Sequence, residues 1–339
     1  MPMFNFDADR FVKIQTGAVA LAAEIDAAAE RYVAEGIDSV FFLGTGGAAI
    51  LMYPAANLLA QHSRLKVFTE RAAELVLTDH RSLGPRSLIF IPSLSGTTKE
   101  SVKLLAFLKE RGVRTLSLTG HKDTPLAQEA DHNFTNFAED DTSSEMFYLQ
   151  TLIIVLAILA ERGEFKNWDA VVADLQKLPK LLVDAKEAFE GKAATLAADI
   201  KDEKYHIFTG AGSVWPEAYY YGMCILEEMQ WIRTRPVHAA DFFHGTLELV
   251  EQGVSVFVFK GEDASRPLGD RVEAFAKRYT DKVRVLDTAD VKLSGISAET
   301  RSLISPVILA TLLERLSAHL EVLRNHPLTT RRYYKRVEY

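Results

Sequence analysis

The chain has 339 residues, of which 48% are hydrophobic and 25% are charged, and its formal net charge at pH 7 is −7. A chain of this length and hydrophobic content can bury two cores, so we expect a globular protein with two domains of typical size. The acidic balance excludes nucleic-acid binding as the main function, because neutralising a phosphate backbone needs many basic side chains.

The single cysteine, Cys224, excludes an internal disulfide framework and a metal site built from cysteines. One cysteine in a long chain is typical of the reducing cytoplasm. The first ten residues contain acidic side chains and lack the basic-then-apolar order of a signal peptide. We therefore expect a cytoplasmic protein that is not exported.

The N-terminal half alternates short apolar runs with helical patterns. We expect a helix over 18–36 and then four buried strands with helices between them, over 39–44, 65–69, 87–92 and 114–119. This alternation is typical of a doubly wound α/β domain, in which helices cover both faces of a parallel sheet. The apolar run 146–160 is shorter than the ~20 residues of a membrane span, and it contains the polar Gln150. We expect it to form a buried helix.

The same order of patterns occurs again in the C-terminal half. The matching segments are 204–213 with 38–47, 254–266 with 87–99, and 282–288 with 113–119. A tandem duplication of one α/β unit explains this repeat. We therefore expect a first domain over 1–163, a charged helical connector over 164–203 and a second domain over 204–339.

Four hydroxyl side chains surround one glycine in the segment SLSGTTKE, residues 93–100, which joins a predicted strand to a helical pattern. In a parallel sheet the ligand crevice lies beyond the carboxyl ends of the strands, where helix N-termini carry about half a positive charge. Hydroxyl donors and a helix dipole can hold a phosphomonoester without a lysine, and Gly96 lets the backbone approach it closely. The alternative is an ordinary turn whose Ser and Thr residues cap the helix.

The second half differs at the corresponding turn, where Glu262 and Asp263 would repel a phosphate. Only the first half is therefore predicted to bind the anion. Glycine-rich turns at 44–49 and 210–213 follow the first strand of each half, but neither completes the G-x-G-x-x-G dinucleotide pattern. We infer no nicotinamide cofactor and expect tight turns that let a sugar come close.

These features together resemble the sugar isomerase (SIS) family, whose best-known member is the isomerase half of glucosamine-6-phosphate synthase. The resemblance rests on the duplicated α/β unit, the S-x-S-G-x-T loop and the segment FHGTLELVE, residues 243–251. The ending NHPLTTRRYYKRVEY is similar to that of a narrower branch, the fructoselysine-6-phosphate deglycases. The resemblance covers nearly the whole chain and implies two tandem SIS domains of the doubly wound, flavodoxin-like type.

The resemblance implies roles for individual residues. Glu228 matches the catalytic glutamate of the family, and His244 matches its histidine, which a neighbouring subunit typically delivers. The residues implied in phosphate or substrate binding are Gly44, Thr45, Gly46, Ser93, Ser95, Gly96, Thr97, Thr98, Ser144, Glu145 and Lys335. Two positions depart from the family pattern: Gly46 replaces a serine that contacts phosphate, and Thr246 replaces the proline of the usual H-G-P.

The residues taken alone leave simpler roles open. Of the adjacent Glu227 and Glu228, at least one is expected to be a solvated or ion-paired surface residue, and His238 is expected to be an ordinary loop residue. The spacing of His238, Asp241 and His244 does not indicate a metal site. We predict that the protein needs neither a metal nor a redox cofactor.

The resemblance implies the release of an amine from a 6-phosphorylated fructosamine, an Amadori conjugate of an amino acid. Glu228 would move a proton between C1 and C2, His244 would assist ring opening, and imine hydrolysis would give glucose 6-phosphate. The resemblance also implies a homo-oligomer, at least a dimer with shared sites, and a C-terminal tail that folds over the active site.

Three other functions stay open at this stage. Two are enzymatic, an amino-sugar-phosphate deaminase and an aldose–ketose phosphosugar isomerase. The third is a noncatalytic phosphosugar sensor, which would usually carry a DNA-binding helix-turn-helix that the acidic segment before the first strand does not resemble. The residues do not indicate which amine is released, or whether a C1 or a C2 conjugate is preferred.

Overall fold

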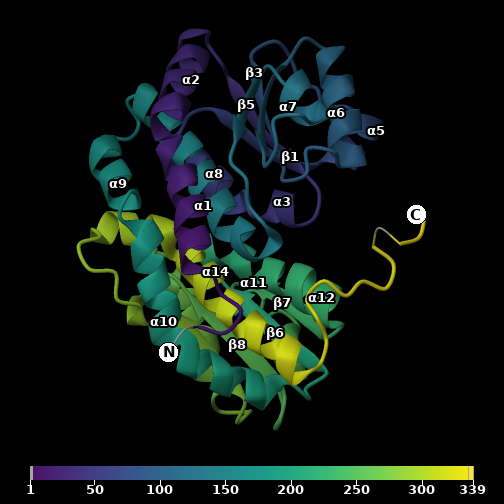
Figure 1. Cartoon of the computed structure of the whole chain (residues 1–339), viewed down its shortest axis with the longest axis vertical. Coiled ribbons are helices and arrows are strands. Elements are labelled where there is room, and N and C mark those ends of the chain that lie inside the picture. The colour runs from purple at the N-terminus through teal and green to yellow at the C-terminus, as the bar shows by residue number, and fades with distance from the viewer. Residues whose placement is uncertain (1–2, 335, 339) are drawn as a thin grey trace. The chain divides into compact units, whose positions relative to one another are not determined.

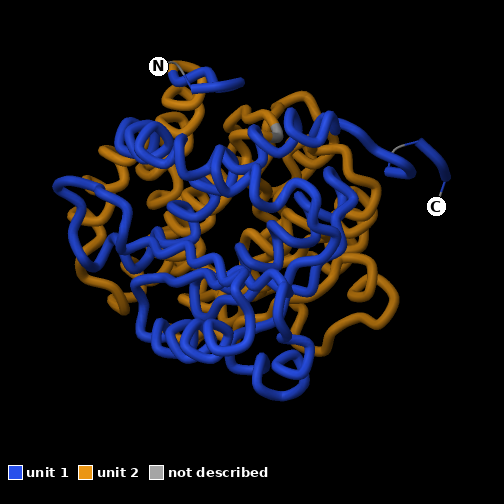
Figure 2. The backbone as a smooth tube through the Cα atoms, turned by 90° about the horizontal axis from the view of Figure 1, so that it is seen from below, with its two compact units in different colours: residues 1–8, 180–339 blue, residues 9–179 orange. Residues whose placement is uncertain are grey.

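A computed structural model describes residues 3–334 and 336–338 of the chain. The described residues group into two compact units, which Figure 2 shows in different colours. Unit 2 comprises residues 9–179, and unit 1 comprises residues 1–8 and 180–339. The boundary between them falls inside the segment 164–203.

Unit 2 is built on a five-stranded parallel sheet with the strand order β2-β1-β3-β4-β5 (Figure 1). Its strands are β1 (Ser39–Gly44), β2 (Lys66–Arg71), β3 (Ser87–Ser93), β4 (Arg114–Thr119) and β5 (His132–Thr135). Its helical elements are α1 (Ala8–Ala20), α2 (Ala22–Ala34), α3 (Gly47–Ile50), α4 (Tyr53–His62), α5 (Ala72–Thr78), α6 (Lys99–Lys109), α7 (Pro125–Glu129), the 3-10 turn η1 (Asp140–Thr142), α8 (Ser143–Glu161) and α9 (Trp168–Leu175).

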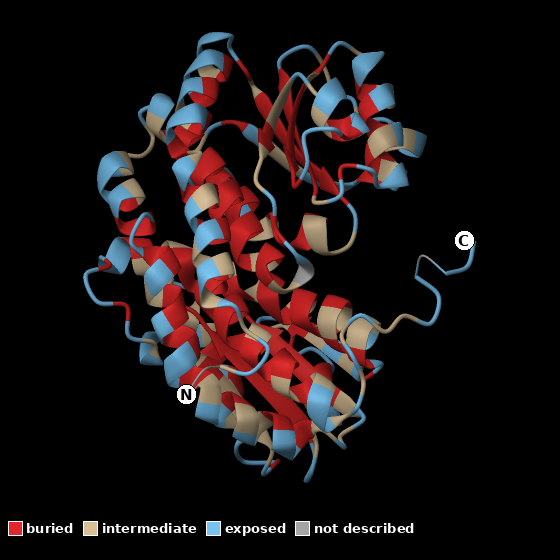
Figure 3. Ribbon diagram, viewed as in Figure 1, coloured by how far each residue is buried: buried red, intermediate tan, exposed pale blue. Residues whose placement is uncertain are grey.

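The sheet of unit 2 is buried on both faces because its central strands carry apolar side chains at successive positions. Phe41 and Ile89 belong to a core cluster that includes residues of α5, α6 and α7. Their neighbours Phe42 and Phe90 alternate to the opposite face, where they are buried with ring centroids 5.0 Å apart. Figure 3 shows these strands as a continuous buried layer, as expected for a parallel sheet between helices.

Unit 1 repeats this plan with a four-stranded parallel sheet in the order β7-β6-β8-β9. Its strands are β6 (Tyr205–Gly210), β7 (Arg233–His238), β8 (Ser255–Lys260) and β9 (Val283–Asp287). Its helical elements are α10 (Leu178–Ile200), η2 (Gly212–Val214), α11 (Trp215–Tyr220), the π-helix η3 (Tyr221–Glu227), α12 (Glu228–Gln230), η4 (Thr246–Leu249), α13 (Arg266–Ala276), η5 (Thr288–Asp290) and α14 (Ala298–Leu323). Phe208 and Phe257 pack with α10, α11 and α14 on one face, while Ile207 and Val258 pack with α13 on the other.

Two helices, α8 and α14, are long and apolar enough to cross a membrane by length and composition. However, 89% of the apolar window of α8 and 83% of that of α14 are buried inside the protein. Both therefore have the environment of core helices. The prediction of a buried helix over 146–160 is confirmed, and Gln150 within it is buried too.

The predicted order of elements is confirmed, with three local corrections. Strands β1, β3 and β4 and their counterparts β6, β8 and β9 lie where the repeat placed them. The helix predicted over 18–36 is in fact two helices, because the first begins at Ala8 and the chain turns at Leu21. The edge strands β5 and β7 were not predicted, since β5 has only four residues and Pro236 interrupts the strand pattern of β7.

Candidate functional site

The strand order of unit 2 reverses between β1 and β3, because β2 lies outside β1 and β4 lies outside β3. In open α/β sheets a ligand crevice forms at such a switch point, beyond the carboxyl ends of the strands. The glycine turn 44–46 follows β1, and the hydroxyl loop, residues 93–98, follows β3. The fold therefore brings the two predicted phosphate-binding turns side by side.

The hydroxyl loop presents most of its side chains to solvent. Ser95, Thr97 and Thr98 are exposed, while Ser93 at the end of β3 is buried. The hydroxyls of Ser93 and Thr98 lie 2.9 Å apart, and the Ser95 hydroxyl accepts hydrogen bonds from the backbone N–H and hydroxyl of Thr97. Within the part of the chain that the structure describes, these four hydroxyls bond only to the loop itself. Three of the four, those of Ser95, Thr97 and Thr98, belong to exposed residues.

The loop leads directly into α6, which begins at Lys99. Thr98 is its N-cap residue, but the Thr98 side chain makes no capping hydrogen bond. Among the described residues, the first backbone N–H groups of α6 therefore lack a cap from Thr98, and the positive end of the helix dipole favours an anion there. This arrangement favours the predicted phosphate role over the alternative in which Thr98 serves as a cap.

Gly96 is required by the shape of the loop. Its φ is +62°, and a Cβ at this position would lie 2.1 Å from Oγ1 of Thr124. Its N–H donates to the carbonyl of Ser93, and its own carbonyl accepts from the N–H of Leu126 at the start of α7. The loop is thus held from both sides in a conformation that only glycine adopts without strain.

Ser144 and Glu145 lie in the first turn of α8, also in unit 2. Glu145 is buried, with 1% of its surface exposed, and Ser144 is partly exposed. Their placement at a helix N-terminus agrees with the sequence reading. Their contact with a substrate stays a prediction.

Glu228 lies in unit 1, where it begins α12 directly after the π-helix η3. Short π-helical segments are rare and occur frequently at functional sites. The preceding Glu227 accepts hydrogen bonds from the backbone N–H and hydroxyl of Thr234 on β7, at 3.1 and 2.7 Å. Gly222 permits this close packing, because a Cβ there would lie 2.9 Å from the Thr234 hydroxyl. Of the two glutamates, Glu227 therefore fastens the helix to the sheet, and Glu228 is the candidate base.

Glu228 forms an ion pair with Arg331 of the C-terminal tail, the segment 325–338. Its Oε1 lies 3.0 Å from Nε of Arg331, and 35% of the Glu228 side chain is exposed against 13% of the Arg331 side chain. The described tail thus contacts the helix that carries the candidate base. The predicted Lys335 lies outside the described residues.

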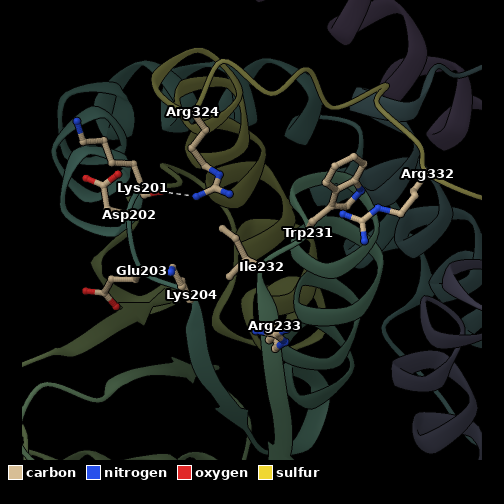
Figure 4. A pocket seen from close by; sticks show the side chains of 9 residues that line it. All are labelled: Lys201, Asp202, Glu203, Lys204, Trp231, Ile232, Arg233, Arg324 and Arg332. Carbon is tan, nitrogen blue, oxygen red and sulfur yellow. Dashed lines mark hydrogen bonds between the residues drawn. The ribbon is translucent and has the colours of Figure 1, made fainter.

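Two further contacts join the tail to the end of α12. The side-chain amide of Gln230 donates to the carbonyl of His326 at 2.7 Å. The guanidinium of Arg332 lies over the ring of Trp231 at 4.1 Å, and Figure 4 shows these two side chains together. The neighbouring arginines of the tail therefore have different partners, Trp231 for Arg332 and Glu228 for Arg331.

His244 lies in unit 1 beyond the carboxyl end of β7. It is exposed, and its N–H closes a turn on the carbonyl of Asp241. Glu228 is near the amino end of the same strand, because its neighbour Glu227 bonds to Thr234 there. The six residues of β7 span roughly 17 Å from first to last. Unit 1 therefore does not bring Glu228 and His244 of one chain together.

His238 has a structural environment, as the simpler reading predicted. Its Nδ1 accepts from the N–H of Ala240, and its ring packs edge-on against Trp215 with centroids 5.6 Å apart. Thr246, which departs from the family pattern, is buried and accepts a hydrogen bond from Arg235 at 3.0 Å. Among the described residues no three His, Cys, Asp or Glu side chains gather in a way that could hold a metal ion.

Cys224 lies one turn before Glu228 but is not a candidate nucleophile. Burial raises the pKa of its thiol to about 12, and the negative charges of Glu228 and Glu217 act in the same direction. The thiol is therefore protonated at neutral pH. Its neighbours show that this part of unit 1 is rich in carboxylates.

A separate pocket of unit 1 opens at the amino ends of β6 and β7 (Figure 4). Its lining residues are Lys201, Asp202, Glu203, Lys204, Trp231, Ile232, Arg233, Arg324 and Arg332. Arg324 donates to the backbone carbonyls of Lys201 and Gln230, so it ties together the ends of α10 and α12. Of the predicted site residues that the structure describes, none lines this pocket, and Arg324 serves the fold.

Comparison with known proteins decides the family. The SIS domain matches residues 36–160. Fructosamine deglycase FrlB of Bacillus subtilis is 31% identical over 322 residues, which cover 93% of this chain and 97% of that protein. The chain belongs to the SIS family.

Other comparisons extend the SIS assignment to both units. Fructoselysine 6-phosphate deglycase of Escherichia coli K12 is 28% identical and covers 91% of this SIS protein and 89% of its own length. A solved structure from Salmonella typhimurium, provisionally assigned as a phosphosugar isomerase, has a TM-score of 0.88 at 28% identity and covers 95% of this chain and 97% of its own. The C-terminal domain of glucosamine-fructose-6-phosphate aminotransferase from Francisella tularensis shares the fold, with a TM-score of 0.79 at 17% identity over 95% of this chain and 97% of its own. The predicted pair of SIS domains is confirmed.

Two features of this SIS protein were missed from the sequence. The π-helix before Glu228 has no recognised sequence pattern, although the small Gly222 inside an apolar helix was a usable signal. The ion pair between Glu228 and Arg331 joins residues far apart in the chain. The arginine pair of the tail was noticed, but nothing in the sequence says which arginine meets which partner.

Proposed function

We propose that this SIS protein is a deglycase that converts a 6-phosphorylated fructosamine into glucose 6-phosphate and a free amine. The observation that carries the proposal is the hydroxyl loop at the β1/β3 switch point, in a chain 31% identical to a fructosamine deglycase. Neutral donors and the N-terminus of α6 suit a sugar phosphate. The similarity to fructoselysine 6-phosphate deglycase of Escherichia coli supports fructoselysine 6-phosphate as the class of substrate.

Glu228 is proposed as the group that moves the proton. Its carboxylate removes a proton from C1 of the open-chain ketose, which leaves an enaminol, and it returns a proton to C2. The amine at C1 thereby becomes an imine. Water adds at C1, the amine departs, and the aldehyde of glucose 6-phosphate remains. A positioned acid–base group of this kind contributes ~10²–10⁴-fold to the rate.

His244 is proposed to assist ring opening from a neighbouring subunit. Support comes from the placement of Glu228 and His244 at opposite ends of β7, which separates them within one unit 1. A histidine exchanges protons near neutral pH, as the ring oxygen requires. A homodimer with shared sites would join the two groups. Mixing subunits that carry Glu228→Gln with subunits that carry His244→Asn should then restore activity, and no recovery would contradict sharing.

The test is an assay of purified protein with fructoselysine 6-phosphate and with glucosamine 6-phosphate. We expect glucose 6-phosphate and lysine in equal amounts from the first substrate and little turnover of the second. Glu228→Gln should lower kcat by ~10²–10⁴-fold. Glu227→Gln is the matched control, because it changes the adjacent carboxylate, whose partner is Thr234. It should lower thermal stability and keep most of the turnover.

Two outcomes would overturn the proposal. Turnover of glucosamine 6-phosphate alone would identify a deaminase. Unchanged turnover by Glu228→Gln would place the base elsewhere.

A further inference from the structure

The C-terminal tail presents one arginine to the candidate base in a fixed geometry. Nη1 of Arg331 donates to the carbonyls of Leu328 and Thr330, at 2.6 and 3.1 Å, while its Nε faces Glu228. The segment 328–331 that forms these contacts is fixed to α14, because the N–H of Leu328 donates to the Glu321 carboxylate at 3.0 Å. The guanidinium is therefore built into the tail and is not a mobile surface group.

Part of this guanidinium has no hydrogen-bond partner among the residues that the structure describes. Within the described residues, Nη2 of Arg331 makes no hydrogen bond, whereas Nη1 and Nε are occupied as above. A guanidinium carries five N–H donors in a rigid fork and can bind two carboxylates at once. The ring of Tyr334, 6.0 Å from the guanidinium carbon, lies on the same part of the tail.

A substrate of the proposed class brings a second negative charge to this place when its sugar is joined to the α-amine of the amino acid. In a fructosamine made from an α-amino acid, only the amine nitrogen and the α-carbon separate C1 from the carboxylate. A base poised over C1 and C2 must therefore lie a few ångströms from that carboxylate. The surroundings are already acidic, since Glu217, Glu227 and Glu228 all act on the Cys224 thiol. Like charges this close repel strongly unless a cation lies between them.

We infer that Arg331 recognises the α-carboxylate of the amine portion of the substrate, bridging it to Glu228, and so selects amino-acid conjugates over neutral amine conjugates. The inference rests on the proposed function of Glu228. It names the class of released amine that the sequence left open, one with a carboxylate on the carbon next to nitrogen. Arg331 is thus a specificity-determining residue.

The test compares two nearly isosteric conjugates of fructose 6-phosphate, one with glycine and one with glycinamide at C1. They differ only at this group, where the charged carboxylate of one is a neutral amide in the other. Charge-assisted hydrogen bonds to a carboxylate are strong, so we expect the wild-type protein to favour the glycine conjugate by roughly 10- to 100-fold in kcat/KM. Arg331→Met should reduce that preference to about twofold or less. Calorimetric binding of both conjugates gives the same comparison without turnover.

Arg332→Met is the matched control, since it removes the adjacent arginine, which lies over Trp231 instead of Glu228. It should weaken the tail but keep the preference for glycine. The inference would be overturned if Arg331→Met lowered kcat/KM equally for both conjugates. It would also be overturned if the wild-type protein did not prefer the glycine conjugate over the glycinamide conjugate. If neither conjugate is turned over but the charge preference in binding depends on Arg331, the inference holds and the proposed deglycase reaction fails.

Discussion

The two switch-point loops of the molecule occupy matched positions of a duplicated sequence and have opposite chemistry. The matched pairs are Ser93 and Lys260, Ser95 and Glu262, Gly96 and Asp263. In unit 2 the loop carries hydroxyls that bond only among themselves within the described residues. In unit 1 the loop carries charges, and each of the three has a partner in its own unit.

The unit 1 loop is a closed network. Asp263 accepts hydrogen bonds from the N–H and hydroxyl of Ser213, at 2.9 and 2.5 Å, so it spans the turns after β6 and β8. Glu262 pairs with Arg301 of α14 at 2.8 Å, and Lys260 pairs with Glu273 of α13 at 3.0 Å. The turn whose hydroxyls bond only among themselves within the described part of unit 2 is thus matched in unit 1 by a turn that side chains fasten to its surroundings. The two copies of this turn therefore differ in role: one has exposed hydroxyl donors, and the other is part of the scaffold.

The largest expected difference comes from two glycines, Gly96 of the hydroxyl loop and Gly212 of the turn after β6, to which Asp263 is bonded. Gly96→Ala puts a methyl group against Thr124 at a φ of +62°, and Gly212→Ala puts one 2.5 Å from Oδ1 of Asp263 at a φ of +57°. Both should lose about 1–2 kcal/mol of stability from the left-handed backbone alone. Only Gly96→Ala should also displace the phosphate, and a shift of about 1 Å in positioning can cost ~10²-fold in kcat/KM.

The measurement is kcat/KM for fructoselysine 6-phosphate together with the Kd for glucose 6-phosphate in both variants. If Gly96→Ala and Gly212→Ala lose similar affinity for glucose 6-phosphate, the phosphate does not bind specifically at the hydroxyl loop.

The next prediction is a substitution in unit 1 that lowers stability and leaves activity nearly unchanged. Asp263→Asn replaces a carboxylate that accepts from Ser213 and from the N–H of Ser265 with an amide that can accept on one side only. An unsatisfied donor near the core costs about 1–3 kcal/mol, so we expect the free energy of unfolding to fall by that amount. Activity per folded molecule should change by about twofold at most. Asp290→Asn removes the same charge from an exposed residue and should leave stability nearly unchanged.

The contrast between the loops also marks what the sequence could predict. Buried strands were predictable because β1, β3, β6 and β8 each contain a short run of apolar side chains, and the repeat then gave their order along the chain. The position of the hydroxyl loop after β3 was predictable because the carboxyl ends of the strands in a parallel sheet lie at one edge. The partners of Asp263 and Arg331 were not, because these contacts join segments distant in the chain and depend on side-chain geometry. The π-helix was not predicted either, since tertiary packing against Thr234 overrides the local helical pattern.

The smallest expected effect is a difference between the two sheets in how their stability depends on pH. His206 on β6 stands where Val40 stands on β1, and it is fully buried with its Nδ1 2.7 Å from the Ser255 hydroxyl. Burial lowers the pKa of His206 from 6.5 to about 4, and the opposing charge of Glu203 offsets only part of that shift. The imidazole of His206 is therefore protonated below about pH 6.5 in the unfolded chain but only below about pH 4 in the folded chain. Stability from this residue is complete above pH 6.5 and is lost as the pH falls toward 4.

At pH 5.5 the loss should be on the order of 1 kcal/mol relative to pH 7.5, because this pH lies one unit below the unfolded pKa of the histidine. Hydrogen exchange of the amides of β6 and β1, measured at both pH values, tests this in each sheet separately. Protection of β6 should fall at pH 5.5 in the wild type and stay constant in His206→Val, while β1 should be insensitive to that substitution. An equal loss of β6 protection in both proteins would show that other groups set the acid sensitivity of unit 1. A loss confined to the wild type would show that a single buried imidazole makes one copy of the duplicated sheet acid-labile.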